Sequence, residues 1–105
     1  MAKVRRASSR PSEETELLNH FYLGVASLDT LEDVSHFIKD ILTTQELAML
    51  ARRLRVAELL IQGETYEEIS RQLRVGKDTI ARVHLWVDAG RGGYRTVVGK
   101  IQRHA

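Results

Sequence analysis

The sequence predicts an all-α fold that ends in a helix-turn-helix. Apolar residues recur at spacings of three and four over most of the chain, which is the period of an amphipathic helix. Two Thr-x-x-Glu capping boxes, Thr43–Glu46 and Thr65–Glu68, each stand directly before such a pattern. No strand pattern of useful length is present, apart from a weak one at 96–98. Helices therefore account for the whole predicted architecture.

Length and composition narrow the class of protein. The chain has 105 residues, enough for one domain, and its 43% apolar and 29% charged residues are typical of a globular protein. The absence of cysteine excludes disulfides, thiolate zinc sites and cysteine nucleophiles. No apolar run approaches the roughly 18 residues that span a bilayer, and no apolar h-region follows the basic N-terminus. We therefore expect a cytoplasmic protein that does not enter a membrane.

Charge is divided unevenly along the chain. Residues 1–50 carry a net charge of −3, whereas residues 51–105 carry +5. A polyanion such as nucleic acid would bind the basic half. Charge alone is equally compatible with arginine and glutamate side chains that only solvate helix faces.

The N-terminal region predicts a basic arm followed by two helices. Residues 1–11 lack apolar periodicity and contain four basic residues, so we interpret them as a flexible arm. Ser12 is the expected N-cap of a helix over 12–28, and Thr30 is the expected cap of a shorter helix over 30–39. The side chains expected to face inward are Leu17, Leu18, Phe21, Val25, Leu28, Leu31, Val34, Phe37, Ile38 and Ile41.

A long third helix is predicted between Thr43 and Gly63, because good helix formers fill the segment and glycine often follows a helix end. Residues 91–105 begin with a glycine-rich run, so we interpret them as a basic tail that is mobile or weakly ordered, with order at most around 94–101. These boundaries predict one helical domain over residues 12–90. The expected buried stripe of the long helix is Leu47, Leu50, Leu54, Ala57, Leu60 and Ile61.

Residues 65–88 have the pattern of a helix-turn-helix. The helical segments YEEISRQL and KDTIARVHLWVDA flank the turn Arg74-Val75-Gly76, which is close to the usual three or four residues. Ser70 is the small residue where the two helices approach. The turn commonly has glycine where this chain has Arg74, and a non-glycine residue at positive φ costs about 1 kcal/mol. The apolar contact positions are Ile69, Leu73, Val75, Ile80 and Val83.

An exposed second helix of this length fits the major groove of DNA, which is roughly 12 Å wide. We expect Lys77 and Asp78 to contact base edges, and Arg71 and Arg74 to hold the flanking phosphates. The full set of candidate DNA-contacting residues is Arg71, Arg74, Lys77, Asp78, Thr79, Ala81 and Arg82. The alternative interpretation is a helical corner that docks another protein.

The stretch from Ile41 to about Gly90 resembles the Trp repressor superfamily, in particular the Trp-repressor-related group labelled YerC/YecD. The residues that carry the resemblance are LTTQELAMLARRLRVAELLIQGETYEEISRQLRVGKDTIARV. The resemblance implies a transcriptional regulator, a repressor, that forms an intertwined two-fold homodimer and binds double-stranded DNA. The helices over 12–28 and 30–39 would then interlock with those of a partner subunit; the alternative is that they fold back within one chain.

The resemblance also implies a corepressor pocket. The positions that match the family's ligand-binding threonine and two arginines are Thr43, Arg53 and Arg82, with Leu42 beside them. Val83 and Trp86 stand where the family has glycine and serine next to the ligand, and both could fill the pocket. These departures argue against tryptophan as a cofactor. A regulator that requires a small anionic, amino-acid-like corepressor stays open as an alternative.

No pattern in the sequence supports catalysis or a metal site. The four histidines have neither His-Glu-x-x-His nor another close ligand spacing. Glu67 and Glu68 are adjacent, so they point to different sides of a helix and cannot act as a paired acid and base. The glycines at 90–93 follow a helix and do not open one, which is unlike a phosphate-binding loop. We therefore expect a protein that is not an enzyme.

Overall fold

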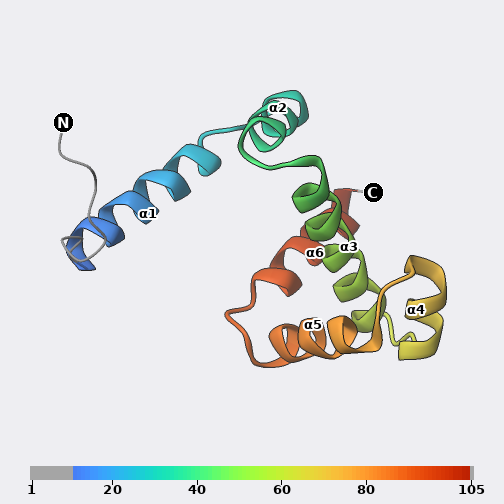
Figure 1. Cartoon of the computed structure of the whole chain (residues 1–105). Coiled ribbons are helices and arrows are strands. Elements are labelled where there is room, and N and C mark those ends of the chain that lie inside the picture. The colour runs from blue at the N-terminus through green and yellow to red at the C-terminus, as the bar shows by residue number, and fades with distance from the viewer. Residues whose placement is uncertain (1–10, 105) are drawn as a thin grey trace. The chain divides into compact units, whose positions relative to one another are not determined.

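The computed structural model describes residues 11–104, and this part of the chain is entirely α-helical (Figure 1). The helices are α1 (Pro11–Ala26), α2 (Leu31–Ile41), α3 (Thr44–Ile61), α4 (Tyr66–Leu73), α5 (Lys77–Ala89) and α6 (Gly93–His104). The predicted all-α class is confirmed. The expected basic arm lies outside the described residues except for Pro11.

Contacts between residues divide the chain into two units, with the boundary between Ile41 and Leu42. The first unit contains α1 and α2, and the second contains α3, α4, α5 and α6. The sequence predicts one domain over 12–90, whereas the second unit starts at Leu42 and includes the whole of α6.

In the first unit, α1 begins one residue earlier than predicted. Pro11 is the first helical residue, so Ser12 lies within the first turn and is not the N-cap. Proline suits this position because the N–H that it lacks has no partner at a helix start. The predicted cap of α2 is confirmed, since the backbone N–H of Asp33 donates to Oγ1 of Thr30 at 3.0 Å.

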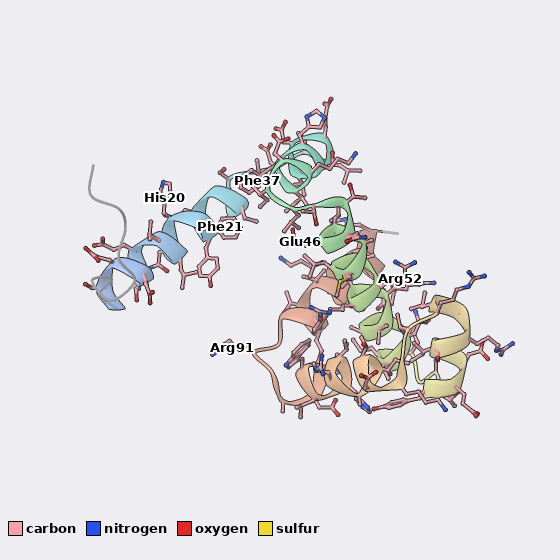
Figure 2. All side chains as sticks on the ribbon, viewed as in Figure 1. His20, Phe21, Phe37, Glu46, Arg52 and Arg91 are labelled. Carbon is pink, nitrogen blue, oxygen red and sulfur yellow. The ribbon has the colours of Figure 1, made fainter. Side chains whose placement is uncertain are left out.

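The apolar side chains of the first unit are largely uncovered. The rings of Phe21 and Phe37, labelled in Figure 2, lie 6.1 Å apart between centroids and connect α1 to α2. Leu23 is nevertheless 70% exposed and Leu31 is 85% exposed, and α2 has no buried residue. Within the first unit, most of the inward face predicted for these helices is therefore uncovered.

In the second unit, α3 is the central helix and contacts α4, α5 and α6. Its buried side chains pack against Ile69 of α4 and against Ile80 and Val83 of α5, which are all fully buried. Burial of one such aliphatic side chain stabilises the fold by about 1.5–3 kcal/mol. Leu73 and Val75 pack partly buried against this core. The predicted contact positions of the helix-turn-helix are therefore confirmed.

The buried face of α3 differs in part from the predicted stripe. Ala57 is buried as expected, and Leu60 and Ile61 pack against the core partly buried. Val56 and Leu59, which the prediction omits, are buried, while Leu50 is exposed. The contacting helices select this face, and their positions are not encoded in the local sequence of α3.

Both ends of α3 are closed by the predicted local signals. Thr43 and Glu46 form a complete capping box: the side chain of each residue accepts a hydrogen bond from the backbone N–H of the other. At the other end Gly63 has φ +93, and its N–H donates to the carbonyl of Leu60. The N–H of Glu64 donates to the carbonyl of Leu59, which completes a Schellman motif.

The helix-turn-helix has the boundaries that the sequence predicts, with α4 and α5 separated by residues 74–76. Thr65 caps α4 by accepting from the N–H of Glu68 at 3.1 Å. The hydroxyl of Ser70 donates to the carbonyl of Val75 at 2.7 Å, which ties α4 to the turn. Arg74 adopts the left-handed conformation at φ 56 and ψ 45, as expected for the position where glycine is common.

The segment after Gly90 is more ordered than the mobile or weakly ordered tail that the sequence predicts, and the order expected around 94–101 is present as part of a helix. Gly92 has φ +86, a backbone conformation that residues with a side chain rarely adopt, and it turns the chain between α5 and α6. Helix α6 then runs from Gly93 to His104. Val98 is buried, and α6 contacts both α3 and α5. Gly92 therefore allows the chain to reverse direction, so that α6 can pack against α3 and α5.

Among the helices of residues 11–104, none combines the length and the apolar character that a membrane-spanning helix needs.

The left-handed backbone at Arg74 generates a stability prediction. Arg74→Gly removes the steric penalty of a Cβ at positive φ and should raise the free energy of unfolding by about 1 kcal/mol. Thermal unfolding should show this as an increase in Tm of roughly 4–8 °C. The matched control is Arg71→Gly, which places the same glycine within α4 and should lower Tm. A lower Tm for Arg74→Gly would contradict the prediction.

Candidate nucleic-acid interface

The second helix of the helix-turn-helix has one buried and one exposed face. Ile80, Val83 and Val87 of α5 are buried in the core of the second unit. The opposite side of α5 is exposed at four of the candidate positions, and Thr79 is half-buried at the edge. The exposed four are Lys77, Asp78, Ala81 and Arg82. A helix held in this way presents an exposed face that is polar at Lys77, Asp78 and Arg82 and apolar at Leu85.

The start of α5 has no capping side chain, and the carboxylate of Asp78 lies beside it. Gly76 is the N-cap, and no side chain accepts a hydrogen bond from the first backbone N–H groups in its place. Free N–H groups and the helix dipole favour negative charge at such an end. A Cβ at Gly76 would lie 2.7 Å from Oδ1 of Asp78, so the carboxylate of Asp78 is turned back toward the helix start. Glycine at this position leaves room for that carboxylate.

Arg71 lies on α4 and is already paired. Its guanidinium binds the Glu68 carboxylate, while its side chain stays 76% exposed. The side chain of Gln72 donates a hydrogen bond to Glu68, and together with Arg71 it lowers the pKa of the Glu68 carboxyl below its usual value. Glu68 is thus held in its ionised form, in which it competes with any other anion for Arg71. Glu68 is engaged here and does not complete the second half of the predicted capping box with Thr65.

Two arginines lie at the turn between α4 and α5, Arg74 within it and Arg52 on α3, and the sequence predicts this position only for Arg74. Arg74 is exposed at the left-handed position. Arg52 reaches from α3, and its Nε donates to the carbonyl of Leu73 at 3.4 Å (labelled in Figure 2). Only the fold brings Arg52 to the end of α4, so no local pattern identifies it.

The positions expected to form a corepressor pocket are only partly gathered. Leu42 and Arg53 line one cavity of about 220 Å³, and Arg53 and Thr79 line another of about 190 Å³. Thr43 is engaged in its capping box, and Arg82 is exposed on α5. The remaining side chains of these two cavities are Glu46, Met49, Leu50, Arg52 and Val75, with Gly76.

An indole of the chain itself lies on the predicted ligand arginine. The guanidinium carbon of Arg53 is 5.9 Å from the centroid of the Trp86 ring, within the range of a cation–π interaction. Val83, the other residue that departs from the family pattern, is fully buried. Trp86 therefore already gives Arg53 an aromatic partner.

A further cavity of the second unit is apolar. It has a volume of about 510 Å³, and its side-chain lining is Leu54, Trp86, Tyr94 and Val97, with Arg91 at the end of the run. It lies where α5, α6 and α3 meet. Across residues 11–104, no group of three histidine, aspartate or glutamate side chains is placed to hold a metal ion.

Comparison with known proteins identifies the family. The family model of the Trp repressor protein matches residues 16–102. The uncharacterised protein YerC of Bacillus subtilis (strain 168) is 31% identical over 85 residues, which is 81% of this chain and 82% of YerC. The crystal structure of a TrpR-like protein from Eubacterium eligens ATCC 27750 superposes with a TM-score of 0.80 at 26% identity, covering 89% of this chain and 96% of that one. The chain thus belongs to the Trp repressor family.

Proposed function

We propose that this protein is a sequence-specific DNA-binding transcriptional regulator, a repressor, that reads the major groove with α5. The exposed polar face of α5, opposite a face fixed by Ile80 and Val83, carries the proposal. Lys77 and Asp78 lie at the start of this face, where a recognition helix contacts base edges. Membership of the Trp repressor family supports the same reading.

Arginines around the reading face would hold the phosphates. Arg71, Arg74 and Arg82 are all exposed, and they flank α5 on α4, in the turn and on α5 itself. Contacts of this kind supply much of the affinity for DNA and make it fall steeply with salt. We assign the protein no catalytic role and place it in the cytoplasm, where a regulator of this family meets DNA.

The functional form would be a homodimer. The first unit leaves large apolar side chains exposed, and the apolar cavity between α3, α5 and α6 is a concave surface in the second unit. Surfaces of this size and character usually bind another protein. A two-fold partner would place two copies of α5 in successive major grooves, roughly 34 Å apart.

We further propose that no tryptophan corepressor is needed. Trp86 lies against Arg53 and Val83 fills the core, so bulky side chains of the chain occupy positions next to the ligand in the family. A small anionic corepressor, bound near Arg53 and Leu42, remains the alternative form of regulation.

The decisive test is selection of bound duplexes from a random pool, run with and without tryptophan and other amino acids. A single enriched motif in both arms supports the proposal. Enrichment of a motif only in the presence of an added amino acid would show instead that the regulator requires a corepressor. No binding in a gel shift at low salt would favour a protein-docking module instead.

The division between base and phosphate contacts predicts a difference between two variants. Lys77→Ala should change the enriched motif, because Lys77 would donate to base edges. Arg71→Ala should retain the motif and weaken binding to all duplexes, with the salt slope reduced by about one. Duplex selection and salt titration measure the two effects. Identical motifs from both variants would refute the assignment.

The pairing of Arg71 with Glu68 predicts that one substitution tightens binding. Glu68→Gln removes the carboxylate that competes with phosphate for Arg71, so affinity for DNA should rise roughly two- to fivefold at low salt. Glu67→Gln makes the same change of charge one residue earlier and is the matched control. Titration of labelled duplex measures both variants. An equal gain in both would show that only net charge matters.

The proposed dimer is tested by its exposed apolar side chains. Leu23→Glu replaces a residue that contributes little to the core of one chain, so it should separate the dimer without unfolding the second unit. Ser12→Glu adds the same charge at the polar start of α1 and should leave the dimer intact. Sedimentation velocity distinguishes the two forms. A monomeric wild-type protein at tens of micromolar would overturn the proposal.

A further inference from the structure

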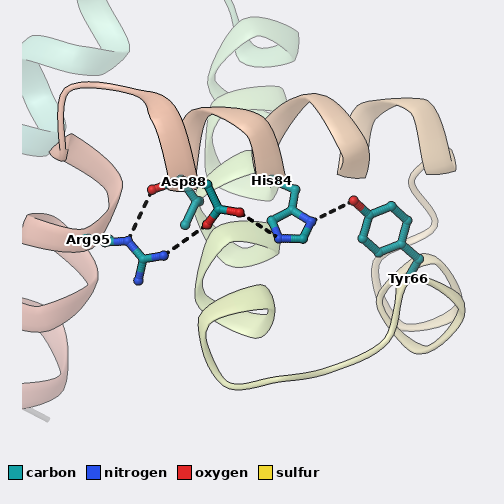
Figure 3. A network of polar contacts seen from close by, with 5 residues as sticks. Tyr66, His84, Asp88 and Arg95 are labelled. Atoms are coloured by element: carbon teal, nitrogen blue, oxygen red, sulfur yellow. Dashed lines mark hydrogen bonds and ion pairs between the residues drawn. The ribbon is translucent and has the colours of Figure 1, made fainter.

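A chain of polar contacts joins three helices of the second unit, and the predicted interface does not use it (Figure 3). Oη of Tyr66, the first residue of α4, lies 2.8 Å from Nδ1 of His84 on α5. Nε2 of His84 lies 3.3 Å from Oδ2 of Asp88, and Oδ1 of Asp88 accepts from Nη2 of Arg95 on α6 at 3.1 Å. We call these four residues the Tyr66–Arg95 network.

Both ends of the network are held by further contacts. The rings of Tyr66 and His84 meet edge to face, with centroids 5.7 Å apart. At the other end, Nε of Arg95 donates to the backbone carbonyl of Val87 at 3.2 Å. Arg95 therefore binds α5 through its side chain twice, with Nη2 at a carboxylate and Nε at the backbone, two donors held at a fixed separation by the planar guanidinium.

The roles of the hydrogen atoms are consistent along the chain. An ionised carboxylate only accepts, so Asp88 favours a hydrogen on Nε2 of His84. In the neutral ring Nδ1 then accepts the hydrogen bond that the Tyr66 hydroxyl donates. Each side chain thus pairs a donor with an acceptor of the next one, and removal of the Tyr66 hydroxyl or the Arg95 guanidinium would break the network.

The network lies on the side of α5 that carries reading residues. Lys77, Ala81, His84 and Asp88 follow one another at spacings of four, three and four, which aligns them on one stripe of a helix. The contacts of His84 and Asp88 thus fix this stripe from α4 at one side and from α6 at the other. Arg95 binds Asp88 and the backbone of Val87, both on α5, so we assign its side chain to the contact between α5 and α6.

We propose that the Tyr66–Arg95 network positions the reading helix: it holds α5 between α4 and α6 at the rotation that DNA recognition requires. The inference rests on the proposed function and assigns α6 a part in it. The four residues act through Lys77 and its neighbours and are positioning residues.

Two substitutions that keep the net charge test the network. Tyr66→Phe removes only the hydroxyl, and Arg95→Lys keeps the charge but loses the two-point contact. Each should weaken binding to the duplex that the wild-type protein selects by about two- to tenfold, the range of one hydrogen bond. The salt slope should stay unchanged, because no phosphate contact is removed. Arg103→Lys, the same exchange elsewhere on α6, should leave binding unchanged.

Rescue at His84 separates positioning from general loss of stability. His84→Ala should weaken binding as Tyr66→Phe does, and His84→Gln, whose amide can both accept and donate, should restore most of the affinity. Binding is measured well below the Tm of every variant. Affinities of Tyr66→Phe and Arg95→Lys equal to the wild-type value would overturn the inference while leaving the DNA-binding function standing.

The double variant Tyr66→Phe/Arg95→Lys tests the network without DNA. If the contacts form one chain, the loss in Tm of the double variant is smaller than the sum of the two single losses. Simple additivity in Tm shows that the two ends are independent, and this result overturns the network whether or not the protein binds DNA. Failure of the wild-type protein to select any duplex, with coupling still present, would remove the proposed function and the role of the network in it, and would leave the coupled contacts between α4, α5 and α6 standing.

Discussion

The packing of α4 and α5 against α3 is the constraint on which the rest of the molecule depends. Ile69, Ile80 and Val83 are fully buried together, and their packing limits the rotation of α5 about its own axis. That rotation decides which side chains remain outside. A core in which one aliphatic residue fits badly would turn α5 and move Lys77 and Asp78 from the exposed face. Apolar packing therefore sets the polar surface that DNA would meet.

Local signals explain why the central part of the fold could be predicted. Each boundary from Thr43 to Ala89 coincides with a cap, a glycine or the short turn, and these act within a few residues of sequence. The exceptions are equally physical. Gly92 reverses the chain before α6 and is not a sign of disorder, and the burial of Val98 on the rest of the second unit involves residues distant in sequence. Leu50 is exposed although its spacing fits a buried stripe, because the helices that contact α3 lie elsewhere.

In the candidate site, too, some residues could be identified from the sequence and others only from the fold. The exposed positions on α5 follow from helical period and from the buried residues beside them, so sequence alone could name them. The contact of Arg52 with the end of α4 needs α3 and α4 in place. The contacts from Tyr66 to Arg95 need α4, α5 and α6 in place, and no spacing rule finds either set. The contacts of Glu68 with Arg71 and Gln72 could not be predicted from the sequence either, because Glu68 also fits a capping box with Thr65.

Trp86 and Gly76 each determine the surroundings of a charged side chain nearby. Trp86 gives Arg53 an aromatic neighbour from within the chain. Gly76 acts through its lack of a side chain, because the free space permits the carboxylate of Asp78 to fold back over the helix start. A methyl group at position 76 would push that carboxylate outward. The smallest residue of the turn thus controls the rotamer of a neighbour two positions away, and under the proposed function a side chain at position 76 would alter base preference through Asp78.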